Sequence, residues 1–176
     1  MRSDPTAIGL STALLIAIWF GMLAGLIEGL GLLLFQRLNW ASWGPMLHVS
    51  APILWISPLV DTCLFVALAV LTFGIAWGVT GIRARWRESR LSPRANSSAV
   101  PVIFVLTFAT VYDWLTLTGR LYHKSSLLLA MGVAVVFSRW VRERQSRTIA
   151  FWKKSFPVLC TIYLLTFLGI EGGQRW

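Results

Sequence analysis

The chain has 176 residues, of which 56% are apolar and 13% are charged, and its mean hydropathy is +0.69. This composition is too hydrophobic for a soluble domain of the same length, and it predicts an all-α integral membrane bundle of about five transmembrane helices. The net charge is +9, and the basic residues fall between the apolar runs. This placement excludes a nucleic-acid-binding protein and favours contact with anionic lipid headgroups.

The first apolar run, residues 8–35, holds one charged residue, Glu28, and is long enough to span a bilayer. Gly21, Gly25 and Gly29 recur every four residues, a spacing that lets a second helix approach closely, so we predict a helix-packing face. Glu28 lies about 20° from Gly21 on a helical wheel and is expected to face protein. Two interpretations stay open for Glu28: a hydrogen-bonded structural group, or a functional polar centre.

The second run, residues 51–79, follows a segment, residues 36–50, that breaks the apolar pattern and is typical of an interfacial loop. Pro58 lies near the start of this run. Its missing N–H is expected to kink the helix and to leave a carbonyl that a neighbour must satisfy. Asp61 follows Pro58 closely and is the acid of this span.

The third run, residues 100–119, contains Asp113 and follows a segment with five arginines and one glutamate, residues 82–98. That arginine-rich segment is predicted to be a cytoplasmic loop. The fourth run, residues 125–141, and the last, residues 157–170, are shorter. Between them, the basic and aromatic sequence TIAFWKKSF is predicted to lie on an anionic membrane surface.

The orientation follows from the distribution of Lys and Arg. If the five runs alternate in direction, one side of the membrane holds Arg2 and the basic residues of the second and fourth loops. These loop residues, predicted to face lipid headgroups, are Arg83, Arg85, Arg87, Arg90, Arg94, Arg139, Arg142, Arg144, Arg147, Lys153 and Lys154. The other side holds only Arg37, Arg120, Lys124 and Arg175. The excess predicts a cytoplasmic N-terminus and an extracytoplasmic C-terminus.

With this orientation, all three intramembrane acids fall in the outer half of the bilayer. At 1.5 Å per residue, Glu28, Asp61 and Asp113 lie about 9, 6 and 5 Å outward of their span centres. They form either one polar cluster or three separate hydrogen-bonding groups. The candidate cationic partners are Arg37, His48, Arg120, His123 and Lys124.

The sequence indicates no metal, cofactor or catalytic site. The two histidines are far apart, and no zinc-ligand, P-loop, dinucleotide-binding or nucleophile-elbow motif is present. Cys63 and Cys160 lie inside apolar runs without a CxxC spacing and are expected to be inert core thiols.

The order of several short motifs resembles the N-terminal membrane region of bacterial membrane-bound sulfatases of the alkaline phosphatase superfamily. These motifs are EGLG at residues 28–31, ILWISPLVD at residues 53–61, an arginine-rich turn at residues 139–154, Pro157, and GGQRW at residues 172–176. In that family, an extracytoplasmic hydrolase domain follows, and its Cys/Ser-x-Pro-x-Arg motif supplies a formylglycine nucleophile beside a divalent metal.

Neither Cys63 nor Cys160 continues that catalytic motif, so none of the family's catalytic residues can be carried over. The resemblance implies a bacterial inner-membrane anchor or interaction module that lacks the hydrolase domain. Sulfatase-type hydrolysis would then need a catalytic domain supplied elsewhere. The alternative is a small transporter or channel subunit that uses Glu28, Asp61 and Asp113.

Overall fold

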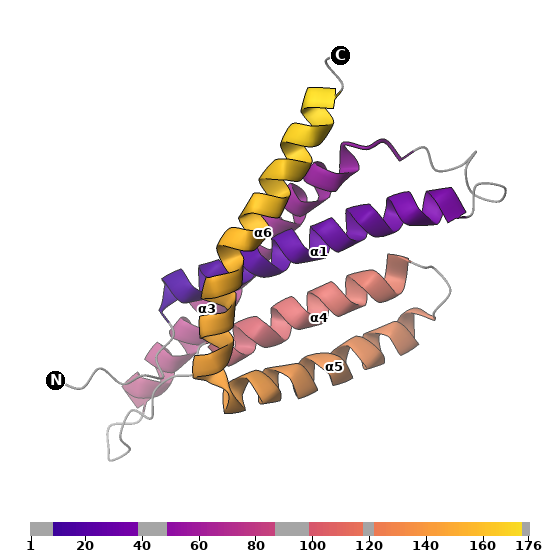
Figure 1. Cartoon of the computed structure of the whole chain (residues 1–176). Helices are drawn as coiled ribbons and strands as arrows, with labels where there is room; N and C mark the ends of the chain where they lie inside the picture. Colours follow the sequence, from indigo (N-terminus) through magenta and orange to yellow (C-terminus); the bar gives the residue numbers. More distant parts are fainter. Residues whose placement is uncertain (1–8, 39–48, 87–98, 118–121, 174–176) are drawn as a thin grey trace.

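The computed structural model describes residues 9–38, 49–86, 99–117 and 122–173. These described residues form five helices and no strand: α1 (Leu10–Leu38), α3 (Ile53–Trp86), α4 (Ala99–Leu117), α5 (His123–Glu143) and α6 (Gln145–Gly173) (Figure 1). The predicted all-α fold is therefore confirmed over these ranges.

Four helical segments are long and apolar enough to cross a membrane: Leu10–Leu38, Ile53–Ala76, His123–Glu143 and Gln145–Gly173. The third predicted span corresponds to α4, whose apolar segment, Val100–Thr116, is shorter. The structure thus supports four of the five predicted spans by length and composition, and α4 adds a fifth, shorter apolar helix.

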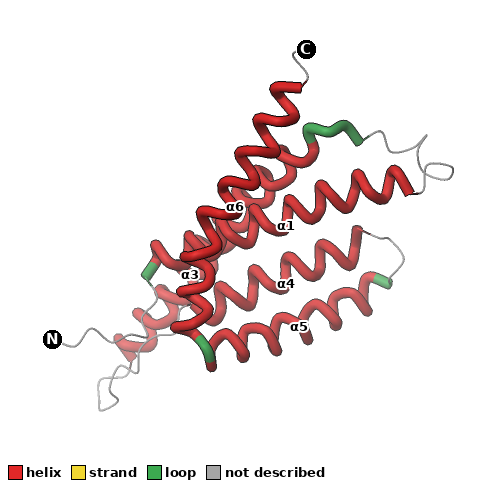
Figure 2. The backbone as a smooth tube through the Cα atoms, viewed as in Figure 1, coloured by secondary structure: helices red, strands yellow, loops and turns green. Residues whose placement is uncertain are grey.

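The α5–α6 junction differs from the prediction. The last helix begins at Gln145 and runs without interruption through Pro157, which was predicted to start it. Pro157 deprives only the carbonyl of Lys153 of its intrahelical donor, and Lys153 is exposed, so solvent can satisfy that carbonyl. The turn lies earlier, at Arg144, whose backbone N–H donates to the carbonyl oxygens of Trp140 and Val141. Figure 2 shows the chain turning sharply at this point.

Helices α1 and α3 form the most extensive pair in the bundle. A Cβ atom added at Gly21 would lie 2.5 Å from the Cα of Thr62, and one added at Gly25 would meet the backbone of Pro58. A Cβ at Gly29 would lie 3.1 Å from a carbonyl oxygen in the first turn of α3. The backbone of α3 therefore occupies the space that side chains would need on this face of α1.

A second close pair is formed by α4 and α5, which lie side by side (Figures 1 and 2). The buried face of α5 presents a small residue every four positions: Ser126, Ala130, Ala134 and Ser138. None of these four side chains is more than 6% exposed. Small side chains on one helical face let the partner helix approach, as glycine does on α1. This small-residue face of α5 was not predicted from the sequence.

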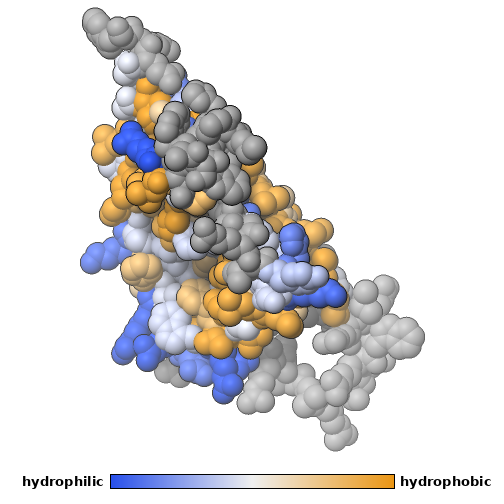
Figure 3. All heavy atoms as spheres, turned by 90° about the vertical axis from the view of Figure 1, so that its right-hand side faces the viewer, coloured by the Kyte–Doolittle hydropathy of each residue, from blue (hydrophilic) through white to orange (hydrophobic). Residues whose placement is uncertain are grey.

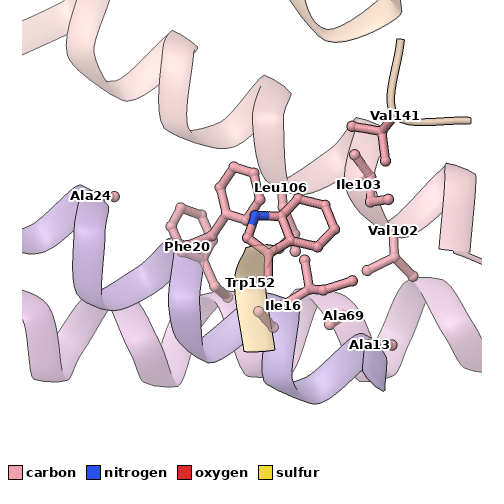
Figure 4. Packing of buried hydrophobic residues seen from close by; sticks show 12 residues of the cluster. Ala13, Ile16, Phe20, Ala24, Ala69, Val102, Ile103, Leu106, Val141 and Trp152 are labelled. Atoms are coloured by element: carbon pink, nitrogen blue, oxygen red, sulfur yellow. The ribbon is translucent and has the colours of Figure 1, made fainter. Parts of the chain in front are cut away.

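The main apolar core lies where α1, α3 and α4 meet the α5–α6 junction. Trp152 is 2% exposed and lies in the middle, beside Ile16, Phe20 and Leu106 (Figure 4). The cluster is completed by Ala13, Ala17, Ala24, Phe65, Ala69, Val102, Ile103 and Val141. Because α6 contributes a single large indole to this core, its N-terminal half is fixed to the bundle by Trp152.

Candidate functional site

The structure brings Glu28 of α1, Asp61 of α3 and Asp113 of α4 to one place. The hydroxyl of Ser57 donates a hydrogen bond to Oε2 of Glu28 over 2.8 Å. The carboxyl groups of Glu28, Asp61 and Asp113 lie near enough to one another to interact electrostatically. These four residues form a polar cluster shared by three helices.

Local sequence explains how α3 contributes two members of this cluster. Ser57 and Asp61 are four residues apart, so their side chains lie on the same face of the helix. That face lies against the glycines of α1, where the close backbones let the short side chain of Ser57 reach Glu28. Ser57 is only 8% exposed, whereas Asp113 lies on an exposed part of α4.

The polar cluster is not fully satisfied within the described part of the chain. Oδ2 of Asp61 and Oγ1 of Thr62 are buried atoms without a hydrogen-bond partner there. Asp61 therefore keeps unused hydrogen-bonding capacity where α3 packs against α1.

The expected cationic partners that the structure describes form no ion pair with these acids. Arg37, His123 and Lys124 are exposed, and Arg139–Glu143, at 3.5 Å, is the ion pair seen among the described residues. The other two candidates, His48 and Arg120, lie outside the described residues. Within the described ranges, no group of three or more His, Cys, Asp or Glu side chains is suited to hold a metal ion.

The expectation for the two cysteines is corrected in part. Both are free thiols, but Cys63 is exposed and Cys160 is half-buried, so neither lies in the core. The apolar sequence around Cys63 reflects the outward surface of α3, where Leu64 is also exposed. An apolar run in a long helix covers every face, so sequence alone did not separate the outer surface from the interior.

Six of the predicted lipid-facing basic residues gather around the α5–α6 junction, and all are exposed: Arg139, Arg142, Arg144, Arg147, Lys153 and Lys154. The side chains of Arg83 and Arg85, at the end of α3, and the whole of Arg87, Arg90 and Arg94 lie outside the described residues. On the face drawn in Figure 3, the surface is mainly apolar and strongly hydrophilic side chains gather on its lower part.

A cavity of about 560 Å³ lies beside this junction, and the sequence analysis did not identify it. Aromatic rings from three helices line it: Trp19 and Phe20, Phe137 and Trp140, Phe151 and Trp152. Arg144 and Arg147 line the same space. Trp19 and Phe20 are far in sequence from the aromatic residues of α5 and α6. The six rings come together because α1 packs against the α5–α6 junction.

Comparison of the chain with protein-family models, curated proteins and solved structures finds no match. The resemblance to sulfatase membrane regions therefore stays a hypothesis. The polar cluster gathers three carboxyl groups between helices, and the described residues show no nucleophile paired with a base there.

Proposed function

We propose that this chain is a non-catalytic, multi-pass membrane anchor or interaction module of a bacterial inner membrane. The observation that carries the proposal is the apolar outer surface of the long helices. Leu64, Leu71 and Ile75 on α3, and Leu165 and Leu168 on α6, are each more than half exposed. Such surfaces are stable against lipid or another membrane helix, and they are unfavourable in water.

The proposed orientation places the N-terminus and the basic α5–α6 junction at the cytoplasmic leaflet. The Lys and Arg distribution supports this orientation, because basic loops are retained on the cytoplasmic side and attract anionic lipids. The partners in this proposal are the anionic leaflet and either an extracytoplasmic hydrolase domain of sulfatase type or another membrane subunit. The motifs at residues 28–31, 53–61 and 172–176 resemble those of sulfatase membrane regions, and this resemblance supports a hydrolase domain as the partner.

Membrane retention of a fused enzyme tests the anchor function. A periplasmically active reporter enzyme is fused after Trp176 and the membranes are washed with alkaline carbonate, which removes peripheral proteins. The reporter is expected to stay in the membrane pellet with the chain and to be soluble when exported alone. Release of the fusion by carbonate would exclude a membrane-spanning anchor.

A second function, that of a proton-conducting or cation-conducting subunit, is favoured by one specific observation. Glu28, Asp61 and Asp113 come from three different helices and still lie together. Ionisable groups inside a membrane bundle often mark proton or ion pathways. Flux through the purified protein in liposomes distinguishes this function from a passive anchor.

A further inference from the structure

The aromatic cavity between α1, α5 and α6 has rigid walls. The indole N–H of Trp19 donates to Oγ of Ser155 over 2.9 Å, which joins α1 to α6 across the cavity wall. The ring centroids of Trp19 and Phe20 lie 6.3 and 6.1 Å from that of Trp152. Such edge and tilted contacts hold aromatic rings in fixed orientations. The cavity is therefore formed before any ligand enters, as small-molecule sites usually are.

Two cationic residues line this apolar space, and no described acid forms an ion pair with either of them. The guanidinium carbon of Arg144 lies over the ring of Trp140, 5.6 Å from its centroid, within the range of a cation–π interaction. Arg147 lines the same cavity. Among the described residues, neither forms an ion pair, whereas Arg139, one turn earlier, is paired with Glu143.

A cavity with apolar walls and two arginines at its border is suited to an amphiphilic ligand. Two guanidinium groups match a phosphate, because arginine binds phosphate through charge-assisted hydrogen bonds. The walls offer aromatic and aliphatic surface, which a fully polar phosphate compound cannot use but a hydrocarbon chain can. Trp140 and Phe151 are also 43% and 58% exposed, so the cavity is open toward the surroundings of the bundle. Tryptophan and arginine at the end of a span are typical of the headgroup level.

We propose that this cavity binds one phospholipid with an anionic headgroup. The phosphate lies against Arg144 and Arg147, and an acyl chain packs on the rings of Trp19, Phe137 and Phe151. This is a discrete site for a single lipid, distinct from the general attraction of a basic surface to an anionic leaflet. It holds for either of the functions proposed above.

Native mass spectrometry of the purified full chain, titrated with phosphatidylglycerol, phosphatidylcholine or glycerol phosphate, tests the site. One phosphatidylglycerol is expected to bind roughly tenfold more tightly than phosphatidylcholine, because only the anionic lipid offers a net charge to two guanidinium groups. Equal affinities for the two lipids would overturn the proposal. Displacement of phosphatidylglycerol by an equal concentration of glycerol phosphate would show a soluble-phosphate site instead and would also overturn it.

Matched charge variants separate a discrete site from diffuse attraction. The double change Arg144→Gln with Arg147→Gln is expected to weaken phosphatidylglycerol binding by about tenfold. The control Lys153→Gln with Lys154→Gln removes the same charge from exposed positions of α6 that do not line the cavity, and it is expected to change binding by less than about twofold. An equal loss in both double variants would overturn the proposal.

A third variant keeps the charge and blocks the space. Leu23 lines the cavity and is half-buried, so Leu23→Trp is expected to fill part of the volume and weaken phosphatidylglycerol binding. Size-exclusion chromatography and circular dichroism check that each variant is folded. Wild-type lipid affinity in folded Leu23→Trp would show that no acyl chain occupies the cavity.

Discussion

The hydroxyl of Ser57 donates to Oε2 of Glu28 over 2.8 Å, and this hydrogen bond joins α3 to α1 beside the closest approach of their backbones. Asp61, one turn further along α3, lies close to the same carboxyl. Glu28 thus lies against two successive turns of one face of α3. Its hydrogen bond with Ser57 stabilises the helix pair whichever of the proposed functions applies.

The first prediction concerns the hydrogen bonding of Glu28. Glu28→Gln keeps an acceptor for the hydroxyl of Ser57, so this variant is expected to fold with near-wild-type stability. Glu28→Leu leaves that buried hydroxyl without its acceptor and is expected to lower the free energy of unfolding by about 1–3 kcal/mol. Thermal unfolding in detergent measures both. Equal destabilisation of the two variants would show that the charge of Glu28 matters more for stability than its hydrogen bonding.

The second prediction uses two glycines of the same helix. Gly25→Ala places a methyl group against the backbone of Pro58 and Ser57 and is expected to destabilise the protein by about 1–3 kcal/mol. At Gly31 an added Cβ meets nothing within 4 Å, so Gly31→Ala is the matched control and is expected to be neutral or slightly stabilising. Denaturant titration in detergent gives both values. The packing of α1 on α3 would be different in solution if the two variants behaved alike.

The contrast between α1 and α5 shows what the sequence could predict. Glycines every four residues in a strongly apolar run are a distinct pattern, and they lie against α3 in the structure. The corresponding face of α5 uses Ser126, Ala130, Ala134 and Ser138, which are common in any helix and therefore gave no signal. The start of α6 was missed because Pro157 suits both the first turn of a helix and a helix interior next to exposed backbone.

The candidate site was predictable only in its depth. A rise of about 1.5 Å per residue placed Glu28, Asp61 and Asp113 at similar heights. The distances between the three side chains depend on the order and the rotation of the helices, which no local sequence pattern encodes. The aromatic cavity shows the same limit, since Trp19 and Ser155 are joined across α1 and α6. Ser57 lies one helical turn before Asp61 and therefore on the same face of α3. This spacing was the sequence feature that could have indicated Ser57 as the partner of Glu28.

The third prediction compares two neighbouring aromatic residues of α6. Trp152 is 2% exposed in the core, and Trp152→Ala is expected to cost about 3–5 kcal/mol of stability because it leaves a large void. Phe151 is 58% exposed, and Phe151→Ala is expected to cost much less. Thermal unfolding and size-exclusion chromatography in detergent measure the difference. A larger loss at Phe151 would mean that α6 is rotated relative to the structure.

The fourth prediction tests the orientation inferred from the basic residues. Alkaline phosphatase is active only after export, so a fusion after Trp176 is expected to be active and a fusion at Ser92 inactive. A cytoplasmically active reporter at the same two positions serves as the control and should give the opposite pattern. Activity of alkaline phosphatase at Ser92 but not at Trp176 would reverse the proposed topology and would move the three acids to the inner half of the bilayer.

The fifth prediction separates the anchor from the conducting subunit. Liposomes containing the purified chain are expected to show no proton or cation flux above empty liposomes, because Glu28 is held by Ser57 as a structural group. If flux is present, Glu28→Gln is the decisive variant, since it preserves the hydrogen bond with Ser57 but cannot release a proton. Arg139→Gln, on the exposed surface of α5, controls for changes in charge. Flux that Glu28→Gln abolishes in a folded protein, and Arg139→Gln leaves intact, would replace the anchor with a proton pathway through Glu28 and Asp61.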